Sequence, residues 1–170
     1  LRNDAKSLHK AGAFTIGALG GTSNDKFLEK NKRVCDCCGF FDDAVNVKGR
    51  GIDDDAREEV MDRISLLREE LMNSSSRYKL AEFMELQYLK YPANGGFYGK
   101  HVDQMLNVDN RLDRDSNHRI ISILLYLNDD TFDVKKHGGS FRAYPRNKNM
   151  IEVEPIGGTL VIFNSQTLLH

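Results

Sequence analysis

The hydrophobic pattern of this sequence changes period near residue 80, and this change constrains the fold more than any other feature. Before it, residues 53–73 form one apolar stripe with successive spacings of four, four, three and four, carried by Ala56, Val60, Ile64, Leu67 and Leu71. That spacing predicts an amphipathic helix. Apolar residues also recur at helical spacing from Leu1 to about Ala13, where Gly12 predicts the end of a short first helix.

Beyond residue 80 the pattern becomes that of β-strands. Segments rich in strand-forming residues are separated by Gly, Pro, Asn or Asp clusters, and no helical pattern intervenes between them; they are 82–91, 119–128, 138–145 and 157–164. Helices followed by a run of strands favour an α+β chain with antiparallel β-structure, either a sandwich or a jelly roll, and helices packed on one side.

Length and charge exclude several classes of protein. The 170 residues suffice for a single domain over 1–170, and no apolar run approaches the ~20 residues of a membrane span. The net charge is -1, so the basic excess typical of nonspecific nucleic-acid binding is absent. We expect a soluble, cytoplasmic monomer with no nucleic-acid or membrane partner. Because the sequence begins with Leu1 and not Met, we expect the native start to lie upstream.

Three cysteines stand together, at spacings too tight for an ordinary disulfide framework; they are Cys35, Cys37 and Cys38. A structural zinc site needs four ligands, commonly as separated pairs, and no second pair stands nearby. We therefore expect unbridged thiols in a reducing compartment.

Residues 91–104 carry the strongest chemical signal. Glycines and Asn94 predict a turn, followed by a short strand at 101–103 in which His101 and Asp103 point to the same face. His170, which follows another predicted strand, is the candidate third ligand. Two histidines and one carboxylate form a facial triad that leaves positions open on iron(II). A hydrogen-bonded histidine at a polar strand end is the alternative interpretation.

Four segments resemble, in order and spacing, the prolyl 4-hydroxylase family of Fe(II)/2-oxoglutarate-dependent dioxygenases. They cover about half the chain and are 91–103, 119–129, 137–145 and 151–170. Residues 7–19 extend the resemblance toward the oxygen-sensing prolyl hydroxylases and their microbial relatives. The resemblance implies a double-stranded β-helix (jelly roll) core over about 81–170, with a helical and lid region over about 1–80. It also implies hydroxylation of a prolyl residue in a protein or peptide, with Fe(II), 2-oxoglutarate and O2 as cofactors and ascorbate as a further one.

The resemblance also implies roles for individual residues. His101, Asp103 and His170 match the family's iron ligands. Tyr126 matches a tyrosine that helps hold the distal carboxylate of 2-oxoglutarate, and Tyr91 matches another that faces this cosubstrate. Without the resemblance, Tyr126 would be interpreted as a core tyrosine and Tyr91 as a loop aromatic.

Two further features concern the wall and the mouth of the site. Alternation along a strand places Ser122, Leu124 and Tyr126 on one face, which predicts one wall of a pocket. Arg119 matches a basic residue near the mouth of the family's site, where it meets the substrate peptide. As a lone residue it would be a solvated charge.

The sequence departs from the family pattern at two places. The family carries an Arg or Lys on the strand after the distal histidine, whereas this sequence ends at His170, so we expect that anchor beyond it. Oxygen-sensing members carry a tryptophan in the lid, and this sequence has none. We expect a different substrate lid here, at about Thr22–Gly51, outside the rigid core.

Two other functions fit the same residues. A nucleic-acid demethylase of the same superfamily would share the ligands but needs a basic groove and stacking aromatics, which the net charge disfavours. A β-sandwich binding module that has lost catalysis is the alternative from another class of protein.

Overall fold

The computed structural model describes residues 1–17, 32–40, 54–76, 78–82, 84–103 and 119–170. The chain divides into two compact units, Leu1–Gly96 and Phe97–His170. Both helices and antiparallel strands occur, which confirms mixed helix and sheet content. The single domain over 1–170 stays a prediction. None of the described helices combines the length and the apolar character needed to cross a bilayer.

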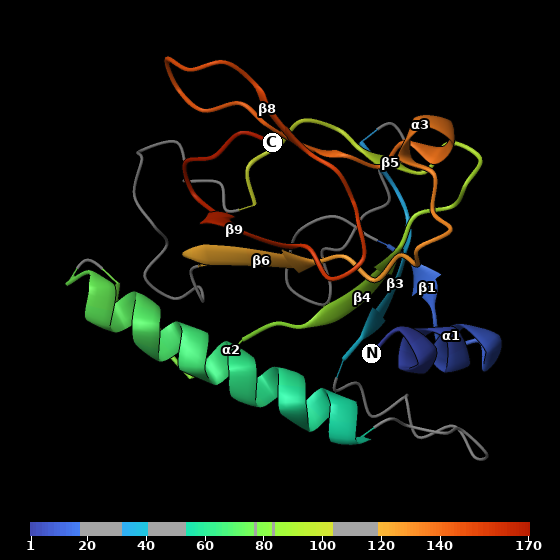
Figure 1. The fold of residues 1–170 in the computed structure, drawn as a ribbon, viewed down its shortest axis with the longest axis horizontal. Helices are drawn as coiled ribbons and strands as arrows, with labels where there is room; N and C mark the ends of the chain where they lie inside the picture. The colour runs from blue at the N-terminus through green and yellow to red at the C-terminus, as the bar shows by residue number, and fades with distance from the viewer. Residues whose placement is uncertain (18–31, 41–53, 77, 83, 104–118) are drawn as a thin grey trace. The chain divides into compact units, whose positions relative to one another are not determined.

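The first unit combines two helices with a three-stranded antiparallel sheet (Figure 1). Its elements, in chain order, are α1 (Arg2–Lys10), β1 (Thr15–Ile16), β2 (Arg33–Val34), β3 (Asp36–Gly39), α2 (Asp54–Ser74) and β4 (Gln87–Lys90). Both expected helices are confirmed. α1 stops before Gly12, whose φ of 77° suits a residue without a Cβ. β3 lies between β1 and β4 in the sheet.

A buried ion pair joins the two helices of the first unit. Asp4 of α1 is 1% exposed, and its Oδ2 accepts a hydrogen bond of 2.8 Å from Arg57 of α2. The Tyr88 hydroxyl of β4 donates to the same oxygen at 2.7 Å. Burial and this hydrogen bond raise the pKa of Tyr88, so the hydroxyl keeps its proton. Arg57 also donates to the Phe40 carbonyl at 2.9 Å, so one charge pair connects four segments.

The lid expected at Thr22–Gly51 is wrong for residues 33–40. β3 pairs with β1 and β4, with Cys37 opposite both Thr15 and Leu89. Phe40, which follows β3, is 4% exposed. The composition of this segment could not reveal that β3 belongs to a sheet, because its pairing partners β1 and β4 lie elsewhere in the sequence. The remaining parts, 22–31 and 41–51, lie outside the described residues. Within the described residues, the cysteines of this segment form no disulfide, as expected.

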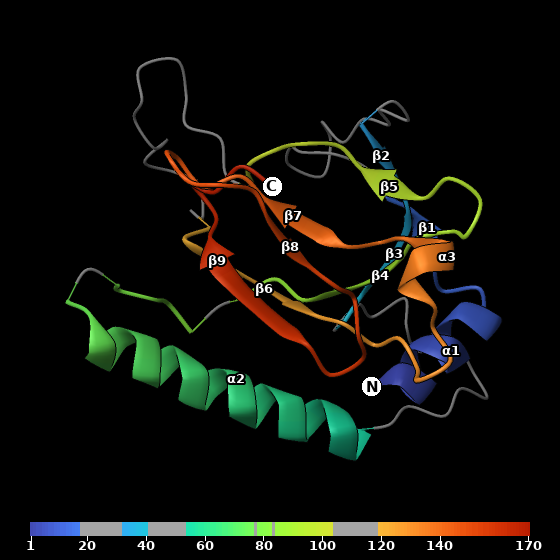
Figure 2. The same ribbon diagram turned by 45° about the horizontal axis from the view of Figure 1, so that its top comes forward.

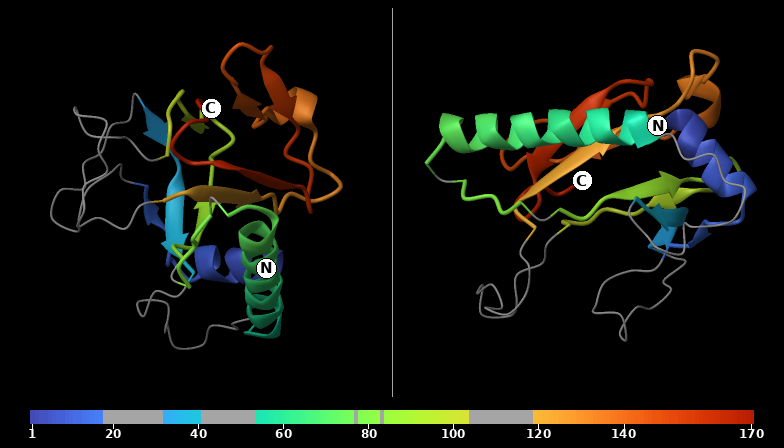
Figure 3. Two further views of the ribbon diagram at one scale, coloured as in Figure 1. Left: turned by 90° about the vertical axis from the view of Figure 1, so that its left-hand side faces the viewer. Right: turned by 90° about the horizontal axis from the view of Figure 1, so that it is seen from below.

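The second unit contains two antiparallel strand pairs (Figure 2). Its elements are β5 (Phe97–Tyr98), β6 (Ile121–Leu125), α3 (Val134–His137), β7 (Phe141–Ala143), β8 (Ile151–Val153) and β9 (Leu160–Asn164). β6 pairs with β9, which run side by side in Figure 3, and β7 pairs with β8. The one-turn helix α3 corrects the expectation of no helix between the strands. Asp133 caps it by accepting from the backbone N–H groups of Lys135 and Lys136, and four residues are too few to show helical periodicity.

The end of the chain lies between two other segments of the second unit. His101 and His170 exchange two backbone hydrogen bonds, of 2.8 and 3.0 Å. The Tyr144 N–H donates to the Leu169 carbonyl at 2.8 Å. Residues 101–103, expected as a strand, are not one, although His101 is paired as a strand residue would be.

The core of the second unit is formed by Phe141, Ala143 and Phe163. Leu124 and Tyr126 pack against this cluster, which confirms that they share a face. The hydrophobic core therefore lies beside the segments that carry His101 and His170, and Phe141 and Phe163 contact the His170 ring.

Replacing Gly157 by alanine is expected to destabilise the second unit. A Cβ at this position would overlap the backbone carbonyl oxygen of Asn128, and backbone cannot move aside as a flexible side chain can. We expect a loss of about 1–3 kcal/mol in the free energy of unfolding, measured by urea denaturation. The exposed Glu154→Ala is the control, with a change within about 0.5 kcal/mol. Equal stability of the two variants would contradict the close approach.

Candidate metal centre

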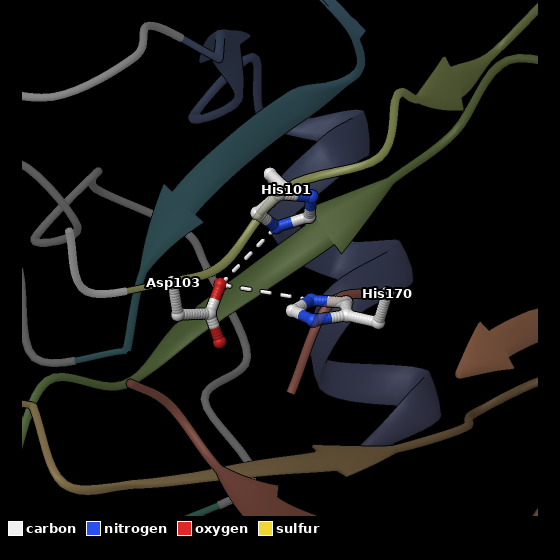
Figure 4. A group of neighbouring side chains, drawn as sticks. All are labelled: His101, Asp103 and His170. Carbon is white, nitrogen blue, oxygen red and sulfur yellow. Dashed lines mark hydrogen bonds and ion pairs between the residues drawn. The ribbon is translucent and has the colours of Figure 1, made fainter. Parts of the chain in front are cut away.

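Three side chains of the second unit converge on one point (Figure 4). His101, Asp103 and His170 each offer one ligand atom, and these atoms all lie within 4.8 Å of one another. Nε2 of His101 lies 3.2 Å from Oδ1 of Asp103, and Nε2 of His170 lies 3.8 Å from the same oxygen. The three residues selected from the sequence are therefore brought together, with all three side chains less than one-fifth exposed.

Both imidazoles are oriented by backbone carbonyl groups. Nδ1 of His101 lies 2.8 Å from the Gly99 oxygen, and Nδ1 of His170 lies 3.1 Å from the Leu168 oxygen. A carbonyl oxygen can only accept, so each Nδ1 carries the hydrogen. The Nε2 atoms, which face Asp103, are left to bind a metal ion, the tautomer that metal-binding histidines commonly adopt.

Aromatic rings hold the two imidazoles from the side. Tyr98 of β5 stacks on His101 with ring centroids 3.5 Å apart. The His170 ring lies 4.5 Å from the Phe163 ring and 5.1 Å from the Phe141 ring. This packing restricts ring rotation, so the Nε2 atoms are aimed before any ligand arrives.

The charge states of the cluster suit a cation. Burial opposes ionisation of Asp103, but the contact with His101, the hydrogen bond donated by Ser122 and the nearby basic groups of His170 and Arg119 outweigh it and lower the pKa of that carboxyl. Burial lowers the pKa of His170. At neutral pH the site therefore presents an ionised carboxylate and a neutral imidazole.

The donor set fits a first-row divalent metal ion. A carboxylate oxygen and two Nε2 atoms are all electron-pair donors, and in the tautomers set by the Gly99 and Leu168 carbonyl groups no hydrogen lies between them. A metal ion can bind all three donors at once. Two nitrogens and one oxygen leave further coordination positions open, as a site that also binds substrates requires.

Oδ2, the second carboxylate oxygen of Asp103, is hydrogen-bonded away from the histidines. The Ser122 hydroxyl of β6 donates to Oδ2, and Ser165 lies 2.7 Å from Ser122 between the two hydroxyl oxygens. Oδ1 is thereby left to the histidines.

The remaining residues selected from the sequence lie at different places. Tyr126 follows β6 and is half-buried, and burial raises the pKa of its hydroxyl, which has no hydrogen-bond partner among the described residues. Arg119, just before β6, is exposed, and its positive charge favours ionised Asp103. Tyr91 follows β4 in the first unit and is 42% exposed.

Sequence reasoning missed two contacts of this centre and one beside it. It did not select Ser165, the partner of Ser122, and it did not predict that Tyr98 stacks on His101. It also missed Lys100, whose Nζ lies 3.7 Å from the centroid of the Tyr144 ring, directly before His101 in the chain. Only the position of Lys100 and Tyr98 beside the H-x-D motif could have indicated them; nothing near Ser165 in the sequence points to Asp103.

Comparison of the sequence with known families and proteins gives concordant matches. Residues 86–170 match the family described as the 2OG-Fe(II) oxygenase superfamily. The chain is similar to the prolyl hydroxylase EGLN3 of Homo sapiens, with 31% identity over 177 residues, which cover 92% of this chain and 70% of that protein. The Mus musculus protein of the same name is 33% identical over 88 residues, which cover 51% of this chain and 33% of that protein.

Two solved structures share the fold. A prolyl-4-hydroxylase of Pseudomonas putida matches with a TM-score of 0.67 and 21% identity, over 99% of this chain and 74% of that one. A prolyl hydroxylase of Trichoplax adhaerens, solved in complex with a peptide fragment of the hypoxia inducible factor oxygen degradation domain, matches with a TM-score of 0.64 and 22% identity. That match covers 99% of this chain and 67% of the other.

Proposed function

The chain belongs to the 2OG-Fe(II) oxygenase superfamily and to its prolyl hydroxylases, and on this basis we propose that it hydroxylates a prolyl residue in a protein substrate. Its cofactors are those of the family, Fe(II), 2-oxoglutarate and O2. The observation that carries the proposal is the convergence of His101, Asp103 and His170, with both Nε2 atoms turned toward one carboxylate oxygen.

His101, Asp103 and His170 would hold the iron. When bound together, iron(II), 2-oxoglutarate and O2 supply an oxidation in which one oxygen atom enters succinate, carbon dioxide leaves, and the other oxygen atom becomes the hydroxyl of the product. The protein orients this chemistry: Gly99 and Leu168 fix the two imidazole tautomers through their carbonyl groups.

Tyr126 and Tyr91 are proposed contacts of 2-oxoglutarate. The raised pKa of Tyr126 keeps its hydroxyl protonated, so it can donate to a carboxylate. It directly follows β6 and, by strand alternation, continues the face that carries Ser122, the partner of Asp103. Tyr91 is proposed from the family resemblance alone.

We further assign the antiparallel pairs β6–β9 and β7–β8 to a jelly-roll core, and the whole chain to one catalytic domain. The registers support the first assignment, because they place Leu124 and Phe163 toward the shared cluster that contacts His170. A closed arrangement of such pairs would carry the three metal ligands on neighbouring strands.

The proposed substrate is a proline-containing peptide, and the Trichoplax adhaerens prolyl hydroxylase supports a peptide substrate because it was solved with a peptide fragment bound. Arg119 supports a contact at the substrate side of the centre, since it is exposed and acts electrostatically on Asp103. An extended peptide needs such a contact to bring one ring carbon to the metal position.

Succinate formation separates peptide from nucleic-acid substrates. With iron(II) and 2-oxoglutarate supplied, proline-containing peptides should stimulate succinate formation by the protein, and methylated oligonucleotides should not. The matched control is the same peptide with its proline replaced by alanine, which should give the unstimulated rate. Stimulation by the oligonucleotide with release of formaldehyde, and no effect of any peptide, would identify a demethylase instead.

A further inference from the structure

Two buried serines connect Asp103 to the backbone of the β6–β9 pair. Ser122 of β6 is 7% exposed, and Ser165, the residue after β9, is fully buried. The Ser122 hydroxyl donates to Oδ2 of Asp103, and the two serine oxygens are 2.7 Å apart. Ser122 bonds Oδ2 of Asp103, whereas both histidines face Oδ1.

Counting protons fixes the direction of this chain of hydrogen bonds. An ionised carboxylate can only accept, so the single hydrogen of Ser122 goes to Asp103. Ser122 must then accept from Ser165, whose hydroxyl supplies the hydrogen between the two serines. Such serial hydrogen bonds polarise one another, and the last one, to a charged acceptor, is the strongest.

The backbone holds both serines in place. Ser122 lies opposite Phe163 in the antiparallel register, and the Ser165 N–H donates to the Ile120 carbonyl at 2.9 Å. The hydroxyls are therefore attached to a paired part of the sheet, whereas Asp103 lies outside any strand. The paired strands β6 and β9 therefore position Asp103 through the two serines.

We propose that Ser165 and Ser122 form a positioning relay that determines which oxygen of Asp103 binds the metal ion. Ser122 holds Oδ2, so that only Oδ1 is presented to the ion beside the two Nε2 atoms. The carboxylate then binds through one oxygen, and the coordination position that its second oxygen would fill stays open for a substrate. This inference rests on the metal centre of the proposed function.

Loss of the relay has a specific effect. In Ser122→Ala, Oδ2 loses its donor and the carboxylate can rotate to bind the ion through both oxygens or to turn away from it. Loss of an outer hydrogen bond to a metal ligand lowers metal affinity by roughly 10- to 100-fold. Ser165→Ala leaves Ser122 in place and should lower the affinity by roughly threefold, the order expected for one neutral hydrogen bond.

Cobalt(II) alone, without cosubstrate or peptide, is the probe, because its visible absorption bands report the number and geometry of its ligands. We would titrate the wild-type protein and four relay variants, and record affinity and spectrum for each: Ser122→Ala, Ser165→Ala, Ser122→Thr and the double variant Ser122→Ala/Ser165→Ala. Ser74→Ala, which removes an exposed hydroxyl bonded to the Leu71 carbonyl, is the matched control and should match the wild type.

Three results are expected together. Ser122→Ala binds cobalt(II) at least tenfold more weakly with altered visible bands, Ser122→Thr restores both properties because it keeps the hydroxyl, and the double variant lacking both serines is no weaker than Ser122→Ala alone. The last result follows because Ser165 acts only through Ser122. The melting temperature of the metal-free proteins shows whether each variant is folded, and if Ser122→Ala is not, Ser122→Thr and Ser165→Ala decide by the same readouts.

Two other results overturn the inference at different levels. Wild-type affinity and spectrum in Ser122→Ala, or in Ser165→Ala if only that variant folds, would remove the relay while leaving the metal centre intact. Failure of the wild-type protein to bind cobalt(II), or equal binding by His101→Ala, would remove the metal centre itself, and the relay with it.

Discussion

Replacing Asp103 by alanine should abolish metal-dependent turnover and leave a folded protein. The substitution removes one of three ligand atoms, so metal affinity should fall by more than the roughly 10- to 100-fold that loss of an outer hydrogen bond costs. No hydrophobic packing is lost, because the core of the second unit is formed by Phe141, Ala143 and Phe163. Calorimetric titration with cobalt(II) and a succinate assay measure the two effects.

The control for this experiment is Asp130→Ala, which removes an exposed carboxylate of the same unit. It should bind metal and turn over as the wild type does. The melting temperature of metal-free Asp103→Ala should fall by only about 2–4 °C for each kcal/mol lost. Full activity in Asp103→Ala would contradict the assignment of this carboxylate as a ligand.

Removing Asp4 should produce the largest loss of stability. Asp4→Ala leaves the nearly buried Arg57 guanidinium without its counter-ion and Tyr88 without its acceptor. Breaking a buried pair by removing one partner costs about 3–5 kcal/mol, because an uncompensated charge stays behind. Urea denaturation followed by far-UV circular dichroism gives the free energy of unfolding.

The double variant Asp4→Leu/Arg57→Leu separates the lost charge pair from the lost contacts. Replacement of both partners by apolar residues removes the stranded charge and should recover much of the stability. Glu59→Ala is the comparison for an exposed pair: Glu59 binds Arg63 on the same helix, with both side chains more than half exposed, and should contribute at most about 0.5 kcal/mol. Equal losses in Asp4→Ala and Glu59→Ala would contradict the structural role of the buried pair.

The sequence predicted those helices and strands that a short stretch of residues is enough to identify. The stripe of α2 and the β-rich segments around β6 and β9 were predicted, since helix and strand periodicity are read within a few residues. The lid prediction was wrong at residues 33–40: the Gly- and Lys-rich composition of 22–51 suggested a segment outside the rigid core, but β3 pairs with β1 and β4. α3 was missed because it is a single turn, capped by Asp133.

In the candidate site, too, some residues could be selected from the sequence and other contacts depend on the fold. His101 and Asp103 were selected because they alternate as strand residues do, although residues 101–103 are not a strand. The backbone hydrogen bonds between His101 and His170 depend on the fold and could not be predicted from the sequence. The bond from Ser122 to Asp103 depends on the register of β6 with β9, and Ser165 joins it through that register. No spacing along the chain encodes such a contact.

Isotopically labelled dioxygen provides the most direct test of the central claim that His101, Asp103 and His170 support hydroxylation of a prolyl residue. The protein would be incubated with iron(II), 2-oxoglutarate, labelled dioxygen and a proline-containing peptide, and the products analysed by mass spectrometry. We expect one labelled oxygen on the proline and one in succinate, and neither product with Asp103→Ala. A peptide that gains no oxygen, or gains unlabelled oxygen from water, would contradict the account.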